Sequence, residues 1–193
     1  MHKSLAGQSV AILLANGFNE IEMTTFLRAM LEAGAIPKII STESSLAHGW
    51  QDKTWGHYHP VDKSLSDALA ADYDMLFVPG GYRSHDKLKS TAHTRRFING
   101  FMMAYKPVLA LGDAVKLMAD IGVLNGMMVY GTVEVKESLA AGGAIWSEIS
   151  PTIHSNVMSA AFDAVNRVEL IETFANFVDG LGAESENDEQ QAA

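Results

Sequence analysis

The sequence predicts an α/β fold, a three-layer sandwich in which helices cover both faces of a mostly parallel sheet. Two observations predict it. Short apolar runs such as Ser9–Leu14 and Met75–Val78 are continuous rather than alternating, which is typical of parallel strands buried on both faces. Segments with helical spacing of apolar residues separate these runs over about 150 residues, and this alternation indicates repeated strand–helix–strand units.

The elements follow one another in a regular order. After the strand Ser9–Leu14, Asn19 and Glu22 stand at capping-box spacing and predict a helix that Gly34 ends. Residues 43–61, rich in Gly, His and Trp, are expected to form a small hairpin. Asn166 and Glu169 are spaced like the capping pair of a last helix. This last helix is predicted over 168–177. The other predicted strands are 36–41, 75–78, 107–111, 127–130 and one near 145, and the other helices are 64–71, 94–105, 114–121 and 133–141.

Length and composition favour one domain over residues 1–183, followed by an acidic, mobile tail over 184–193. The net charge of −9 disfavours nucleic acids and anionic membranes as partners. No apolar run is long enough for a membrane helix or a signal-peptide core, so a cytoplasmic location is expected. The chain has no cysteine, which excludes disulfides, thiolate metal sites and a thiol nucleophile.

Four segments would meet at the carboxyl edge of the sheet, where open parallel sheets bind ligands. They are residues 16–22, 79–83, 112–113 and 130–132. Together, residues 15–22 (ANGFNEIE), 74–81 (DMLFVPGG) and 106–111 (KPVLAL) resemble the ThiJ/PfpI superfamily, which is class I glutamine amidotransferase-like. The resemblance covers about residues 9–147. It implies a flavodoxin-like fold and a group that includes peptidases or amidases, deglycase or glyoxalase-type enzymes and Hsp31-type chaperones.

In that superfamily a cysteine occupies a sharp strand-to-helix bend, the nucleophile elbow, after the strand at 107–111. The resemblance places Gly112 at that position and Asp113 where many relatives have histidine. A histidine that often assists from the next strand is replaced around Tyr130. The acidic Glu22 and the Gly80-Gly81 amides, which help to form an oxyanion hole in the family, are retained. The resemblance therefore implies an elbow without its nucleophile.

Residues 107–116 (PVLALGDAVK) resemble the C-terminal domain of large-subunit catalases, which also lacks the cysteine and for which chaperone-like or stabilising roles have been suggested. This implies a non-catalytic binding or holdase module related to oxidative stress, a homodimer with a small-molecule or protein client and no cofactor. The alternative is a carboxylate-based hydrolase, lyase or isomerase that uses Glu22 and Asp113, with Gly80, Gly81 and Tyr130 binding the ligand. Family labels such as intracellular protease or amidase would attach to the chain by inheritance only.

Each candidate also has a purely structural interpretation. Glu22 stands where a capping-box acid would stand, and Asp113 where a helix N-cap would stand. Lys116, one turn after Asp113, would neutralise it as a helix ion pair. Gly80-Gly81 is also typical of a tight turn at the end of a strand.

The histidines likewise have both a functional and a structural interpretation. His57 and His59 alternate around Tyr58 and would share one face of a strand, so with His48 they are weak candidates for a zinc or nickel site. The more ordinary interpretation is exposure, or packing on Trp50 and Trp55. His85 and His93, with Arg83, Arg95 and Arg96, form a basic stretch that could contact an anion beside the crevice, but a solvated helix face is the more ordinary interpretation. Nothing from the family can be carried onto residues 148–166.

Overall fold

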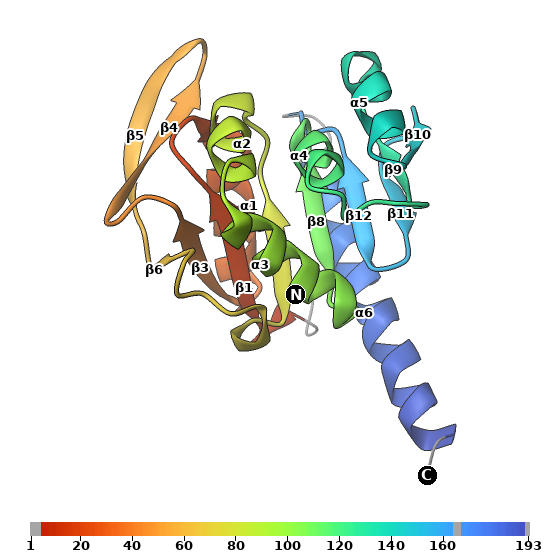
Figure 1. Ribbon diagram of the computed structural model, residues 1–193. Coiled ribbons are helices and arrows are strands. Elements are labelled where there is room, and N and C mark those ends of the chain that lie inside the picture. Colours follow the sequence, from red (N-terminus) through yellow and green to blue (C-terminus); the bar gives the residue numbers. More distant parts are fainter. Residues whose placement is uncertain (1–4, 164–166, 192–193) are drawn as a thin grey trace.

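The computed structural model describes residues 5–163 and 167–191 and has the predicted α/β architecture (Figure 1). The described residues form a seven-stranded sheet in which each neighbouring pair is parallel except the β11–β12 pair at one edge. In spatial order the strands are β11 (Thr152–His154), β12 (Val157–Ala160), β8 (Val108–Leu111), β7 (Met75–Val78), β1 (Ser9–Leu14), β3 (Ile36–Ser41) and β6 (Lys63–Ser64).

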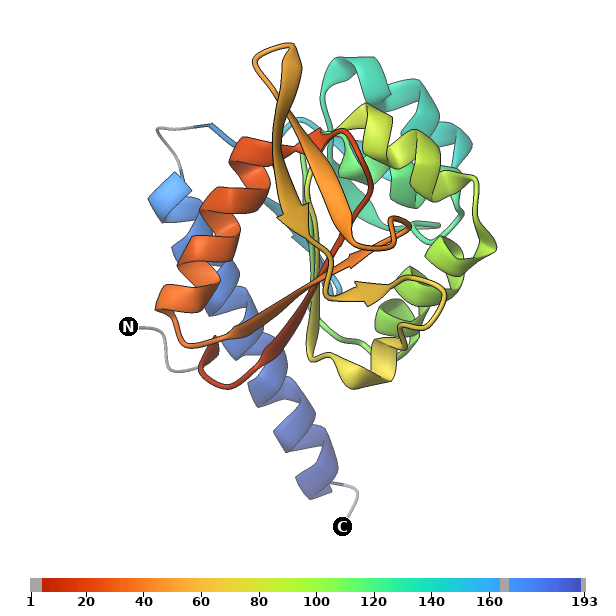
Figure 2. The same ribbon diagram turned by 90° about the vertical axis from the view of Figure 1, so that its left-hand side faces the viewer.

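Helices cover both faces of this sheet, as Figure 2 shows. The helices are α1 (Glu20–Glu32), α2 (Tyr82–Lys89), α3 (Ala92–Met103), α4 (Ala114–Asp120), α5 (Lys136–Ala141) and α6 (Arg167–Gln191), with 3-10 turns η2 (Ala70–Asp72) and η3 (Val133–Val135). Alternate side chains of β1 enter different cores. Ile12 shares a core with Phe26 of α1 and Phe174 of α6, whereas Leu13 shares the other core with Phe97 of α3. Burial on both faces explains why the strand is continuously apolar.

Two small sheets flank the main one. The predicted hairpin is present as β4 (Leu46–Gln51) and β5 (Thr54–Pro60), and β4 also pairs with the short strand β2 (Phe18–Asn19) before α1. At the other side, β9 (Met128–Tyr130) and β10 (Ile145–Ser147) form a separate two-stranded parallel sheet.

The structure differs from the sequence prediction in several elements. The helix predicted over 64–71 is wrong, because the chain there forms β6, a turn and the start of η2. Helix α2 was not predicted, nor were β11 and β12. Residues 184–191 of the predicted acidic tail continue α6 as a helix, while 192–193 and the predicted cap Asn166 lie outside the described residues.

In the described part of the chain, no helix combines the length and the apolar character that a membrane crossing requires.

Candidate functional site

The bend at Gly112 has the backbone of an elbow. Gly112 follows β8 directly, has φ +55°, and its N–H donates to Ala160 O at 2.9 Å. A Cβ placed on Gly112 would lie 3.4 Å from Glu22 Oε1 and 3.9 Å from Gly80 Cα, which is nearly ordinary contact. The position could therefore hold a side chain that points at Glu22, and in this chain it holds none.

Glu22 lies in the first turn of α1, but its carboxylate does not complete a capping box. Its backbone N–H donates to Asn19 Oδ1 at 3.2 Å, as the capping pattern predicts. The carboxylate instead accepts hydrogen bonds from Asn19 Nδ2 at 2.9 Å and from Gly80 N–H at 2.6 Å. The residue is 6% exposed.

The surroundings of Glu22 shift its acidity strongly. Burial raises the pKa of Glu22 from 4.5 to about 7; the Gly80 N–H acts in the opposite direction, the charge of Asp113 adds to the rise, and His85 opposes it. Acid and carboxylate forms of Glu22 are therefore both populated near neutral pH.

Asp113 occupies the N-cap position of α4, yet its side chain makes no capping bond to that helix. Its Oδ1 accepts the Gly81 N–H at 2.7 Å, at the start of α2, and its Oδ2 lies 3.6 Å from His85 Nδ1. Burial alone would raise the pKa of Asp113, but the hydrogen bond and charge of His85 and the Gly81 N–H lower it below its ordinary value. The predicted pairing with Lys116 is wrong, because Lys116 Nζ binds Asp120 at 2.7 Å.

His85 is a site residue that the sequence analysis placed on a solvated helix face. It is 6% exposed in the structure, and its Nε2 lies 3.0 Å from Pro79 O. A carbonyl oxygen only accepts, so Nε2 carries the hydrogen in this contact, and Nδ1 faces the Asp113 carboxylate, which is also an acceptor. The one feature of the sequence that could have indicated His85 is its position four residues after Gly81, which is one helical turn along a helix that begins at the site.

The two carboxylates meet over the Gly80-Gly81 turn. A Cβ on Gly80 would lie 2.9 Å from Glu22 Oε2 and 3.0 Å from Asp113 Oδ1, so only glycine fits between them. Both amides that the resemblance assigned to an oxyanion hole donate to side chains of the chain itself. A titrating carboxyl beside an ionised one is suited to acid–base exchange or polar binding rather than to stabilising an oxyanion.

Comparison with known proteins identifies the family. The model of the DJ-1/PfpI family matches residues 8–179. The chain belongs to the DJ-1/PfpI family. Among its relatives, "Putative cysteine protease YraA" of Bacillus subtilis is 28% identical over 171 residues, covering 84% of this chain and 96% of YraA. "General stress protein 18" of the same organism is 28% identical over 142 residues, covering 72% of this chain and 78% of that protein.

The fold also matches a solved structure of this family. A ThiJ/PfpI domain protein from Brachyspira murdochii superimposes with a TM-score of 0.79 at 18% identity, covering 91% of this chain and 98% of that one. At this identity the likeness concerns the fold.

Tyr130 is the remaining predicted ligand-binding residue at this edge of the DJ-1/PfpI fold. Its backbone N–H donates to Ser159 Oγ at 2.7 Å. Within the part of the chain that the structure describes, no hydrogen bond joins its side chain to Glu22 or Asp113. Ligand binding by Tyr130 stays a prediction.

His57 and His59 share one face of β5, as predicted, and both contact Glu20 in the first turn of α1. The distances are 2.7 Å from His57 Nδ1 and 3.2 Å from His59 Nε2 to Glu20 Oε1, and the His57 N–H donates to Oε2 at 2.9 Å. Burial raises the pKa of Glu20, but these hydrogen bonds outweigh it and hold the pKa below its ordinary value. His48 stacks between Tyr58 and Trp55 instead. No three acidic or histidine side chains among residues 5–163 and 167–191 are arranged to hold a metal.

Glycines in the hairpin make room for Glu20. The strand register shifts between His48 and Trp50, and a Cβ on Gly56 would overlap Glu20 Oε2. We expect Gly56→Ala to lower the free energy of unfolding by about 1–3 kcal/mol, because the added methyl group must displace a buried carboxylate. Urea unfolding measures this loss.

A double-mutant cycle with Glu20→Ala provides the control. In the Glu20→Ala background, Gly56→Ala should lower the free energy of unfolding much less. An equal loss in both backgrounds would show that overlap with the Glu20 carboxylate is not the cause.

Proposed function

We propose that this chain is a non-catalytic DJ-1/PfpI module, of the kind found at the C-terminus of large-subunit catalases, that binds a small molecule or a protein client in a stress-related role. The proposal includes a cytoplasmic homodimer that needs no cofactor. The observation that carries it is Gly112, which keeps the bend of an elbow and has no reactive group. A chain without cysteine has no thiolate to form a covalent intermediate.

Two further observations support binding without covalent chemistry. The Gly80 and Gly81 amides already donate to Glu22 and Asp113, so a substrate oxyanion would have to displace both carboxylates. The position above Gly112 is bordered by Glu22 Oε1, which offers a hydrogen-bonding group to a small polar ligand. The name of the relative "General stress protein 18" supports the stress-related part of the proposal.

Two assays test this function. In the first, a model client protein is heated with and without the purified chain, and light scattering should fall when the chain is present. Unchanged scattering at a several-fold molar excess of the chain would contradict the holdase role. In the second, a metabolite library is screened by thermal shift. Compounds that bind the site should stabilise the wild type and the exposed control Glu134→Gln, but not Glu22→Gln. Equal shifts in all three proteins would place binding elsewhere.

A second candidate function is favoured by one specific observation, the rise of the pKa of Glu22 to about 7. A carboxyl that titrates near neutral pH can take a proton from a small carbonyl compound and return it, as a hydrolase, lyase or isomerase requires. Turnover found in a metabolite screen should then fall roughly 10²–10⁴-fold in Glu22→Gln. Activity unchanged in both Glu22→Gln and Asp113→Asn would rule this function out.

A further inference from the structure

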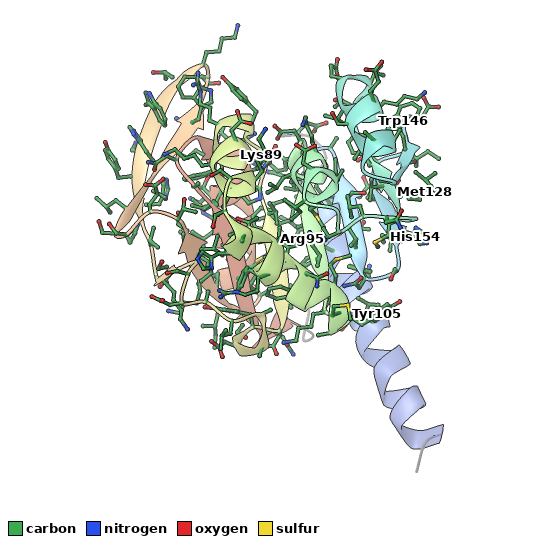
Figure 3. The ribbon with its side chains drawn as sticks, viewed as in Figure 1. Lys89, Arg95, Tyr105, Met128, Trp146 and His154 are labelled. Atoms are coloured by element: carbon green, nitrogen blue, oxygen red, sulfur yellow. The ribbon has the colours of Figure 1, made fainter. Side chains whose placement is uncertain are left out.

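Hydrogen bonds from backbone N–H groups of β9 to side chains of β11 and β12 join the β9–β10 unit to the main sheet. The two sheets are distinct, although β9 lies beside β11. The Met128 N–H donates to His154 Nδ1 of β11 at 2.6 Å, and the Tyr130 N–H donates to Ser159 Oγ of β12 at 2.7 Å. Figure 3 shows Met128 and His154 near each other on this side of the molecule.

The bond at His154 fixes the protonation state of its ring. A backbone N–H can only donate, so Nδ1 must present its lone pair to Met128, and the ring must be neutral with its hydrogen on Nε2. Imidazolium carries a hydrogen on both ring nitrogens and has no acceptor left. In protonated His154 the Nδ1–H would face the Met128 N–H, two donors with no acceptor between them, and the contact with β9 would be lost.

We propose that His154 is a pH-sensitive latch that holds β9 against β11 when neutral and releases it in acid. This device goes beyond the proposed function and does not depend on the Glu22 site. The strands packed at this contact, β9, β11 and β12, contain one other titratable residue, Tyr130, at the far end of β9. No acidic side chain within the described residues forms an ion pair with His154 that would compensate its charge.

Release would change the surface of the molecule. Met128 and Ile145 are paired across β9 and β10 and are 44% and 49% exposed, while Val129 between Met128 and Tyr130 is fully buried. Opening of β9 in acid would add Val129 to an apolar rim that is already exposed. The bond from the Tyr130 N–H to Ser159 Oγ does not depend on His154, so loss of the latch loosens the unit without unfolding it.

Amide hydrogen exchange tests the latch. Histidine side chains generally titrate near pH 6.5, so exchange is measured by NMR at about pH 7.5 and about pH 5 and corrected for the intrinsic rate at each pH. We expect the protection of the Met128 amide to fall on the order of tenfold in acid, the effect of losing one hydrogen bond. The amide of Ile145, which donates to Met127 O within the same unit, should change much less. Constant protection of Met128 between the two pH values would overturn the proposal.

Two substitutions separate the latch from general acid effects. Asn Oδ1 stands at nearly the same place as His Nδ1 and accepts without titrating, so His154→Asn should keep Met128 protected at both pH values. His154→Ala should lose the protection at both. The exposed control His93→Asn should behave like the wild type. Acid-dependent exchange of Met128 that persists in His154→Asn would contradict the proposal.

Discussion

Replacing Gly81 by alanine is expected to lower the free energy of unfolding by about 3 kcal/mol or more. Gly81 has φ +127°, and a Cβ there would lie 2.7 Å from Gly17 O, 2.8 Å from Phe18 Cα and 2.9 Å from Asn19 N. These are backbone atoms, which cannot move away as the end of a flexible side chain can. The strain of the positive φ and the overpacking therefore both contribute to the loss of stability. The denaturation midpoint in urea measures the loss.

Gly122→Ala is the matched control. Gly122 also has a positive φ, +75°, but nothing lies within 4 Å of the position of its Cβ. Only the backbone strain applies there, and we expect a cost of about 1 kcal/mol. Similar losses for the two variants would show that the close approach between the Gly81 turn and the loop before α1 is not important.

Glu22→Gln is expected to remove a large part of the pH dependence of stability. Because the pKa of Glu22 is raised from 4.5 to about 7, the folded chain keeps a proton that the unfolded chain releases between these values. Wild-type stability therefore falls as pH rises from about 4.5 to about 7, by about 3 kcal/mol from this group, and is level on either side of that window. A neutral glutamine does not titrate.

The measurement is the free energy of unfolding of both proteins at about pH 5 and about pH 8. The wild type should lose about 2–3 kcal/mol more than Glu22→Gln over this interval. Parallel pH profiles would show that Glu22 ionises at its ordinary pKa and that burial does not perturb it.

The fold could be predicted because its central strands are buried on both faces. β1, β3 and β7 have the predicted bounds, since a continuous apolar run is a local feature of the sequence. Helix α2 could not be found this way. Its sequence YRSHDKLK is almost wholly polar, and it buries Ser84 and His85 through contacts with other elements.

The candidate site, too, could be predicted only in part: the sequence predicts which residues lie at this edge but not which groups their side chains bind. The positions of Glu22, Gly80 and Asp113 at one edge follow from the order of the strands. The partners of their side chains do not, because Asp113 reaches the start of α2 only where β7 and β8 lie side by side. The local pattern predicted an N-cap for α4 instead. His85 was missed for a related reason, since its burial depends on the Pro79 carbonyl and Asp113 together.

The central claim is that this chain keeps the backbone bend of a nucleophile elbow without the nucleophile, and Gly112→Cys tests it most directly. The new thiol would point at Glu22 from a position with φ +55°, at a cost in stability of about 1 kcal/mol. In mild peroxide, intact-mass spectrometry should find that Gly112→Cys gains oxygen faster than the exposed-cysteine variant Glu134→Cys, with the wild type as the control for methionine oxidation. A folded Gly112→Cys protein whose thiol reacts no faster than an exposed cysteine placed at position 134 would contradict the account.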